Sequence, residues 1–265
     1  MNSLKTNNTH ASVRSRTGPV LAWIALLLGM ACVAAVLLAA LGYRSQALAL
    51  GTAIQSIRWA ATAALVGAVV SLLALVWVVR AGGARRMALW VAVAALLLNV
   101  LVVAPPLYLF AQAKSLPLIH DISTDTSDPP RFVAVVPLRS NAPNPVEYDP
   151  ANVAEQQRGY PDIAPVVLVN TTPSQAFARA EHAARAMGWH IVSTAPEEGR
   201  LEATDSTPLL GFKDDIVVRI RAHTAESGQG QDSVVDVRSV SRVGLSDIGT
   251  NAKRIRAFVR KLQAP

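Results

Sequence analysis

Three long apolar runs dominate the first part of the chain. They cover residues 20–41, 59–79 and 87–110, and none of them contains a charged side chain. A helix as long as the third run measures about 36 Å, whereas the hydrocarbon core of a bilayer is about 30 Å thick. The pattern therefore predicts a bundle of three transmembrane helices within residues 20–114.

The pattern changes after residue 114. Residues 115–130 mix Ser, Thr, Asp and Pro, which predicts an extended linker, and residues 131–265 have the mixed composition of a soluble domain. Ile216, Val218 and Ile220 alternate with polar or charged neighbours, as in a strand with one buried face and one largely polar face. We predict strands at 131–137, 166–169, 189–195, 200–206, 215–221 and 233–242.

Two helices are expected among these strands. Thr172, Pro173 and Gln175 form a capping signature for the first helix, which should end at Gly188. The second helix is predicted at 251–262, where apolar residues recur at helical spacing. Because the strand connections are short, we expect an antiparallel sheet with both helices on one face, an α+β domain behind the transmembrane bundle.

Charge distribution and cysteine content each set one limit on the protein. The chain has 25 basic and 18 acidic residues, but nine of the basic residues and none of the acidic ones precede residue 115, so residues 115–265 carry a formal charge of −2. The basic excess therefore belongs to the ends of the apolar runs and gives no support to nucleic-acid binding. The single cysteine, Cys32, excludes an intramolecular disulfide.

The positions of the basic residues predict how the chain crosses the membrane. Residues 1–19 form a basic tail, and Arg80, Arg85 and Arg86 lie in the short connector between the second and third runs. Lys and Arg accumulate on the cytoplasmic side, so we expect a cytoplasmic N-terminus and a domain on the other side. An alternative is a signal peptide cleaved near residues 47–49.

Three separate sequence blocks resemble one known family. They are IHDISTD (119–125), YPDI (160–163) and DVRSVSRVGLSDIGTNAKRIRAF (236–258), and together they resemble the bacterial family known as domain of unknown function 1499 over about residues 117–263. The resemblance implies a protein of the bacterial envelope with no established activity. With the membrane topology, it implies the bacterial inner membrane and a periplasmic domain.

The positions most characteristic of that family supply the candidate site. The main set is Arg238, Ser239, Ser241, Arg242, Gly244, Ser246, Asp247, Gly249 and Asn251, and a weaker block contains Gly211, Phe212, Asp214 and Asp215. The turn at 242–251 leads from a strand into a helix, and the free N–H groups of a helix start favour an anion or a lipid headgroup. Capping of the helix by Asp247 or Thr250 is the structural alternative.

Catalysis and metal binding have weaker support. A hydrolase or transferase using the Ser246 and Asp247 region is an alternative function, but no catalytic residue is assigned. Asp214 and Asp215 are adjacent in a strand and should point to opposite faces. The histidines lack metal-ligand spacing, so we predict neither a metal nor a cofactor.

The leading hypothesis is an integral membrane protein of the bacterial envelope that presents an α+β binding or interaction domain and is not an enzyme. Its predicted partners are the lipid bilayer and a small anionic ligand or lipid headgroup. Gly67 and Ser71 form a small-residue pair that lets helices pack closely, either within the chain or in a homo-oligomer. A membrane assembly scaffold is therefore a further alternative.

Overall fold

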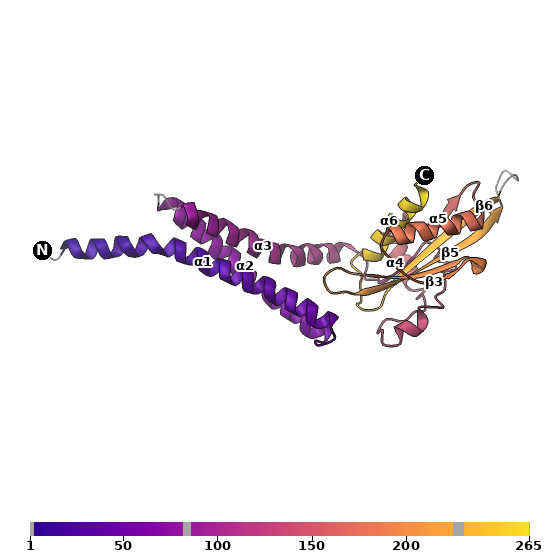
Figure 1. Cartoon of the computed structure of the whole chain (residues 1–265), viewed down its shortest axis with the longest axis horizontal. Coiled ribbons are helices and arrows are strands. Elements are labelled where there is room, and N and C mark those ends of the chain that lie inside the picture. The colour runs from indigo at the N-terminus through magenta and orange to yellow at the C-terminus, as the bar shows by residue number, and fades with distance from the viewer. Residues whose placement is uncertain (1–2, 82–85, 225–230, 265) are drawn as a thin grey trace. The chain divides into compact units, whose positions relative to one another are not determined.

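The chain forms two compact units, Met1–Ala111 and Gln112–Pro265. The computed structural model describes residues 3–81, 86–224 and 231–264. Figure 1 shows long helices in the first unit and a sheet with helices in the second. Each unit is described by itself below.

The first unit confirms the three predicted long apolar helices. They are α1 (Ser3–Arg44), α2 (Leu50–Arg80) and α3 (Arg86–Ser115). Segments Thr17–Arg44, Leu50–Arg80 and Arg86–Ser115 are each long and apolar enough to cross a membrane. Helix α1 begins inside the predicted tail and α3 extends into the predicted linker, whereas Arg85 lies outside the described residues.

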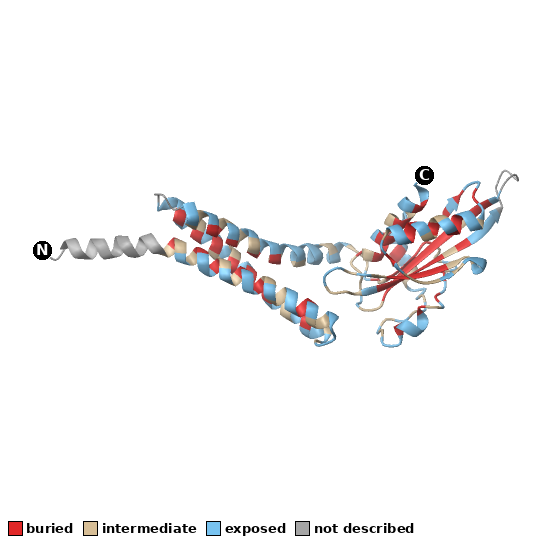
Figure 2. Cartoon of the chain, in the orientation of Figure 1, coloured by how far each residue is buried: buried red, intermediate tan, exposed pale blue. Residues whose placement is uncertain are grey.

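Small side chains fill the interior of this helical unit, and large apolar side chains face outward. Ala22, Ala74 and Ala92 pack together with no exposed surface, while Trp59 and Leu101 are about two-thirds exposed. Figure 2 shows the buried positions as a narrow stripe along each helix. A helix that is apolar on its outer side is suited to lipid, because acyl chains solvate that surface.

Asn99 is buried among the three helices. Its Nδ2 donates to the carbonyl groups of Ala25 at 3.0 Å and Ala95 at 2.8 Å. Its Oδ1 has no hydrogen-bond partner among the described residues and lies against Gly67, where a Cβ would approach it to 2.2 Å. The small-residue position Gly67 is therefore used within the chain to make room for Asn99.

Gly67→Ala is expected to destabilise the helical unit by about 1–3 kcal/mol, because the added methyl group overpacks the contact with Asn99. Gly51→Ala is the matched control, since a Cβ there meets nothing within 4 Å. Thermal unfolding of the full chain in detergent measures both. Equal melting temperatures for the two variants would contradict the proposed contact.

The second unit is built on a six-stranded antiparallel sheet with the order β1-β6-β5-β4-β3, in which β2 also pairs with β6. The strands are β1 (Asp121–Ser123), β2 (Val166–Leu168), β3 (His190–Ala195), β4 (Arg200–Ser206), β5 (Lys213–Thr224) and β6 (Gln231–Ser241). The helices are α4 (Asn152–Gly159), α5 (Pro173–Ala186) and α6 (Thr250–Gln263), with short 3-10 turns η1 (Val136–Arg139) and η2 (Pro196–Glu198).

Helices α5 and α6 cover one face of the sheet, which confirms the predicted α+β architecture (Figure 1). The capping box of α5 also forms as predicted, with Thr172 and Gln175 each bonding the other's backbone. Phe177 of α5 and Phe258 of α6 pack onto Ile216 and Val218 of β5 in the main core. Figure 2 shows the strands as the most deeply buried part of the domain.

The opposite face of the sheet is also covered. Residues 124–150, which include η1, lie over it, and Phe132 and Val135 pack against Val217 and Val240. Charged side chains of this face are consequently buried, so the face predicted to be largely polar is not a solvent-exposed surface. Arg238, Glu202 and Asp236 are all buried there.

The predicted strand at 131–137 is wrong, because its N–H groups bind a carboxylate instead of a neighbouring strand. The N–H groups of Val133, Ala134 and Val135 donate to the buried carboxylate of Glu202 at 2.9–3.1 Å. The segment is therefore a turn that continues into η1. Two further elements were not predicted: β1 lies within the expected linker, and α4 lies between the predicted strands at 131–137 and 166–169.

Candidate functional site

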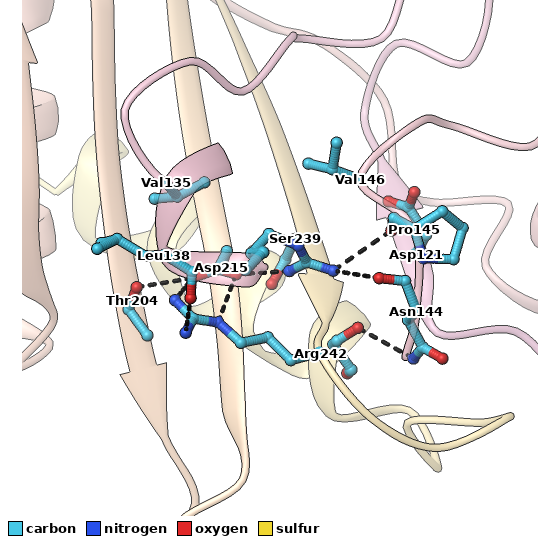
Figure 3. Close-up of polar contacts among 12 residues, drawn as sticks. Asp121, Val135, Leu138, Asn144, Pro145, Val146, Thr204, Asp215, Ser239 and Arg242 are labelled. Atoms are coloured by element: carbon cyan, nitrogen blue, oxygen red, sulfur yellow. Dashed lines mark hydrogen bonds and ion pairs between the residues drawn. The ribbon is translucent and has the colours of Figure 1, made fainter. Parts of the chain in front are cut away.

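Asp215 is the centre of a buried ion cluster on the face covered by residues 124–150. Its carboxylate accepts two hydrogen bonds from Arg242, both at 2.8 Å, one from Thr204 at 2.7 Å and one from Arg139 of η1 (Figure 3). Burial alone would raise the pKa of Asp215, but these hydrogen bonds outweigh it and hold the pKa below its ordinary value. The pair of Arg139 and Asp215 thus attaches the covering segment to the sheet.

The lowered pKa of Asp215 gives stability at neutral pH that is lost in acid. A carboxyl group whose folded-state pKa is depressed stabilises the fold above its unfolded pKa, about 3.9, and loses that contribution as pH falls through the folded value. We expect Asp215→Asn to lower stability at pH 7 and to flatten its decline between pH 5 and 2. Hydrogen exchange of β5 across that range measures the effect, and parallel profiles for parent and variant would contradict it.

Asp214 faces the other side of the sheet, as predicted for adjacent strand residues. It accepts a hydrogen bond from Arg254 of α6 at 2.6 Å. Arg254 also donates to Asn251, which accepts a second hydrogen bond from Ser239 and donates to Ser241. Asp214, Ser239, Ser241 and Asn251 therefore form a buried network that joins α6 to β5 and β6.

The turn before α6 is satisfied by its own side chains. The carboxylate of Asp247 accepts the N–H groups of Gly249 at 2.9 Å and Asn251 at 2.7 Å. Burial raises the pKa of Asp247, although these N–H groups act in the opposite direction. The free N–H groups expected to attract an external anion are thus capped by the chain itself, which is the structural alternative considered from the sequence.

Ser246 and Gly244 also have internal partners. The hydroxyl of Ser246 accepts the N–H of Ile248 at 3.2 Å and lies 3.5 Å from the carbonyl oxygen of Pro117. The carbonyl of Gly244 accepts a hydrogen bond from Asn144 at 2.9 Å. Among the described residues no general base contacts Ser246, so the turn does not assemble a nucleophile with its base.

Arg238, a member of the predicted set, lines a pocket. Its side chain is 3% exposed and forms a two-point ion pair with Asp121 of β1, at 3.0 and 2.7 Å. The carbonyl groups of Pro130 and Val146 accept two further hydrogen bonds. The guanidinium also lies 5.1 Å from the ring centre of Phe132 and 5.3 Å from that of Tyr148, which are cation-π distances.

The pocket beside Arg238 has a volume of about 550 Å³, the size of a small-molecule site. Its lining combines aromatic, hydroxyl and charged groups. Thr126, Ser127, Asp128, Pro129, Arg131, Phe132, Val146, Glu147, Tyr148, Pro150 and Arg238 contribute to it. The two acidic and two basic side chains balance each other.

Burial raises the pKa of Tyr148 in this pocket to about 12, and Asp121 adds to the effect. The phenol therefore stays protonated at neutral pH and donates a hydrogen bond to the side-chain oxygen of Gln156 at 3.4 Å. Burial also raises the pKa of Asp121 despite its pairing with Arg238. In the described part of the chain, no three His, Cys, Asp or Glu side chains are grouped to hold a metal ion.

Sequence reasoning missed most of this pocket. Asp121 lies within the first family-like block, but Phe132, Tyr148 and the other lining residues come from an irregular segment without periodic pattern. A further pocket of about 440 Å³ lies between β2 and α6 and contains Arg256 and Asp162, which pair with each other.

The family comparison agrees with the boundaries of this domain. A model described as "Protein of unknown function (DUF1499)" matches residues 121–262, more than half of the 265-residue chain. The match begins at β1 and ends within α6, so it covers both the sheet and the Arg238 pocket. No curated protein matches the chain. The chain therefore belongs to the DUF1499 family, whose function is unknown.

Proposed function

We propose that this protein is a membrane-anchored binding module whose domain holds a small polar ligand in the Arg238 pocket. The observation that carries the proposal is the buried guanidinium of Arg238. It has five N–H donors, of which hydrogen bonds among the described residues engage four. One N–H of Nη1 thus has no hydrogen-bond partner among the described residues, and Arg238 lines a pocket large enough for a ligand.

The charges around the pocket select the class of ligand. Asp128 and Glu147 balance Arg131 and Arg238, so a simple anion gains little from the site as a whole. A zwitterion can pair its cationic group with a carboxylate and its anionic group with a guanidinium. This refines the anion or headgroup considered from the sequence to a small molecule that carries both charges.

Binding can be tested on the full chain in detergent by titration calorimetry. The zwitterionic probe is glycerophosphoethanolamine, and glycerol 3-phosphate is the anionic probe with the same backbone. We expect saturable binding of the first, weakened about tenfold or more by Arg131→Ala, since a hydrogen bond to a charged group contributes about 1.5–3 kcal/mol. Arg158→Ala is the control, because Arg158 is exposed and pairs only with Glu155 among the described residues.

Three results would overturn the ligand assignment. The first is the absence of saturable binding of glycerophosphoethanolamine. The second is binding that favours glycerol 3-phosphate, and the third is binding that Arg131→Ala leaves unchanged. Each of these results leaves the membrane anchoring intact, because the spans are tested separately.

The proposed orientation places the N-terminus in the cytoplasm and the α+β domain outside it. It is supported by the basic residues of the tail and of the second connector, including Arg80 and Arg86. In a bacterial host, alkaline phosphatase fused after Ser115 should be active and a fluorescent protein fused there should stay dark. The opposite pattern would reverse the orientation.

A further inference from the structure

Three loops of the α+β unit meet at one end of the sheet. They are residues 116–119 after α3, residues 207–212 between β4 and β5, and residues 243–249 between β6 and α6. We call them the proximal loops. The N–H of Arg242 donates to the carbonyl of Lys213 at 3.0 Å, and the N–H of Asp247 donates to the carbonyl of Ile119 at 3.2 Å. These hydrogen bonds hold the loops next to one another.

The proximal loops expose leucine side chains. Leu118 is 72% exposed, Leu245 is 77% exposed and Leu209 is 46% exposed. At the opposite end of the sheet, the turn between β3 and β4 presents Glu197 and Glu198. The proximal loops thus gather three exposed leucines, although contact with water alone gives no reason to place them together.

The chain itself leads the proximal loops toward the bilayer. Helix α3 continues to Ser115, so Leu116 lies about 9 Å along the helix from Phe110, the last residue of its apolar run. The polar zone on each side of a bilayer is about 5–8 Å thick. Leu116 packs against Gly249 of the third loop, so that loop is tied to a segment at the membrane surface.

We infer that the proximal loops rest on the bilayer, with Leu118, Leu209 and Leu245 in the headgroup region. The occupant of this apolar end is thus lipid. The exposed basic residues Lys213 and Lys253 flank the loops and favour an anionic lipid surface. The inference rests on the proposed membrane anchoring and adds a second attachment, made by the folded domain itself.

Fluorescence quenching in proteoliposomes tests this contact. In a Cys32→Ala background, single cysteines replace Leu245, Leu209, Glu197 or Leu101 and are labelled with the fluorophore NBD. The vesicles contain phosphatidylcholine and phosphatidylglycerol, with or without a lipid that carries a nitroxide near its headgroup. We expect several-fold stronger quenching at Leu245→Cys and Leu209→Cys than at Glu197→Cys.

The label at Leu101→Cys tests the membrane anchoring separately from the contact of the loops with lipid, because Leu101 faces outward from α3. Shielding of the label at Leu101 from water-soluble iodide would show that the chain is anchored in the membrane. If, in that case, the nitroxide lipid quenches the labels at Leu245 and Leu209 no more than the label at Glu197, the proposed contact of the loops with lipid is wrong. If the label at Leu101 is open to iodide, the anchoring itself fails. The four labelled positions are exposed in the described structure, so labelling them leaves the core intact.

Discussion

Arg238→Leu is expected to destabilise the α+β domain by about 3–5 kcal/mol, the usual effect of breaking a buried ion pair by removing one partner. The substitution leaves the buried carboxylate of Asp121 without its two-point partner. It also leaves the carbonyl groups of Pro130 and Val146 without the guanidinium. Hydrogen exchange of β5 and β6 in the full chain measures the loss. Arg158→Leu, at an exposed pair, should cost less than about 1 kcal/mol.

The effect of Arg238→Leu should also depend on pH. Burial already raises the pKa of Asp121, and without Arg238 it rises further. A carboxyl group with a raised folded-state pKa favours the fold when protonated and loses that contribution as pH rises through the folded value. The deficit should therefore shrink from pH 8 to pH 5, and Asp121→Asn added to Arg238→Leu should recover part of it. A deficit independent of pH would show that Asp121 is not the source.

Glu202→Gln should cost about 3 kcal/mol and loosen the segment that covers the second face of the sheet. The amide offers one acceptor oxygen and one donor nitrogen where the carboxylate now accepts three consecutive backbone N–H groups. Some N–H groups of Val133 to Val135 would then lie buried without a partner. We expect faster hydrogen exchange in peptides that cover residues 132–139, with a smaller change in β5.

Glu198→Gln is the matched control for this prediction. Glu198 and Glu202 both pair with Arg200, but the Glu198 side chain is 64% exposed and the Glu202 side chain is fully buried. The control should leave stability within about 1 kcal/mol of the parent. If both substitutions had the same effect, the contribution of Glu202 would come from Arg200 alone and not from the backbone of the covering segment.

Local sequence signals predicted the elements that are marked by short-range capping contacts or by a periodic pattern of apolar residues. The capping box of Thr172 and Gln175 marked the start of α5, and the alternation around Ile216 marked β5. The segment at 131–137 has the composition of a strand, yet its N–H groups are bound by Glu202, which is about 70 residues away in sequence. A partner that distant leaves no trace in the local pattern, so the covering segment could not be predicted.

The candidate site was predicted only in part, because its residues also contact partners that are distant in sequence. The family-like positions from Arg238 to Asn251 follow one another in sequence, but strand alternation divides them between the two faces. Ser239 and Ser241 contact Asn251 beneath α6, whereas Arg238 and Arg242 contact Asp121 and Asp215 on the other face. Of these residues only Arg238 borders the pocket, and the other walls come from the irregular segment.

The pairing of β1 with β6 has a consequence for biosynthesis. Strand β1 directly follows α3, but its partner β6 ends at Ser241, close to the C-terminus. The ribosome therefore completes the three hydrophobic helices long before the sheet can close, and β1 waits unpaired while the intervening residues are made. Nascent chains that stop before residue 231 should be degraded readily, whereas the full chain, which has both β6 and the core residues of α6, should resist protease.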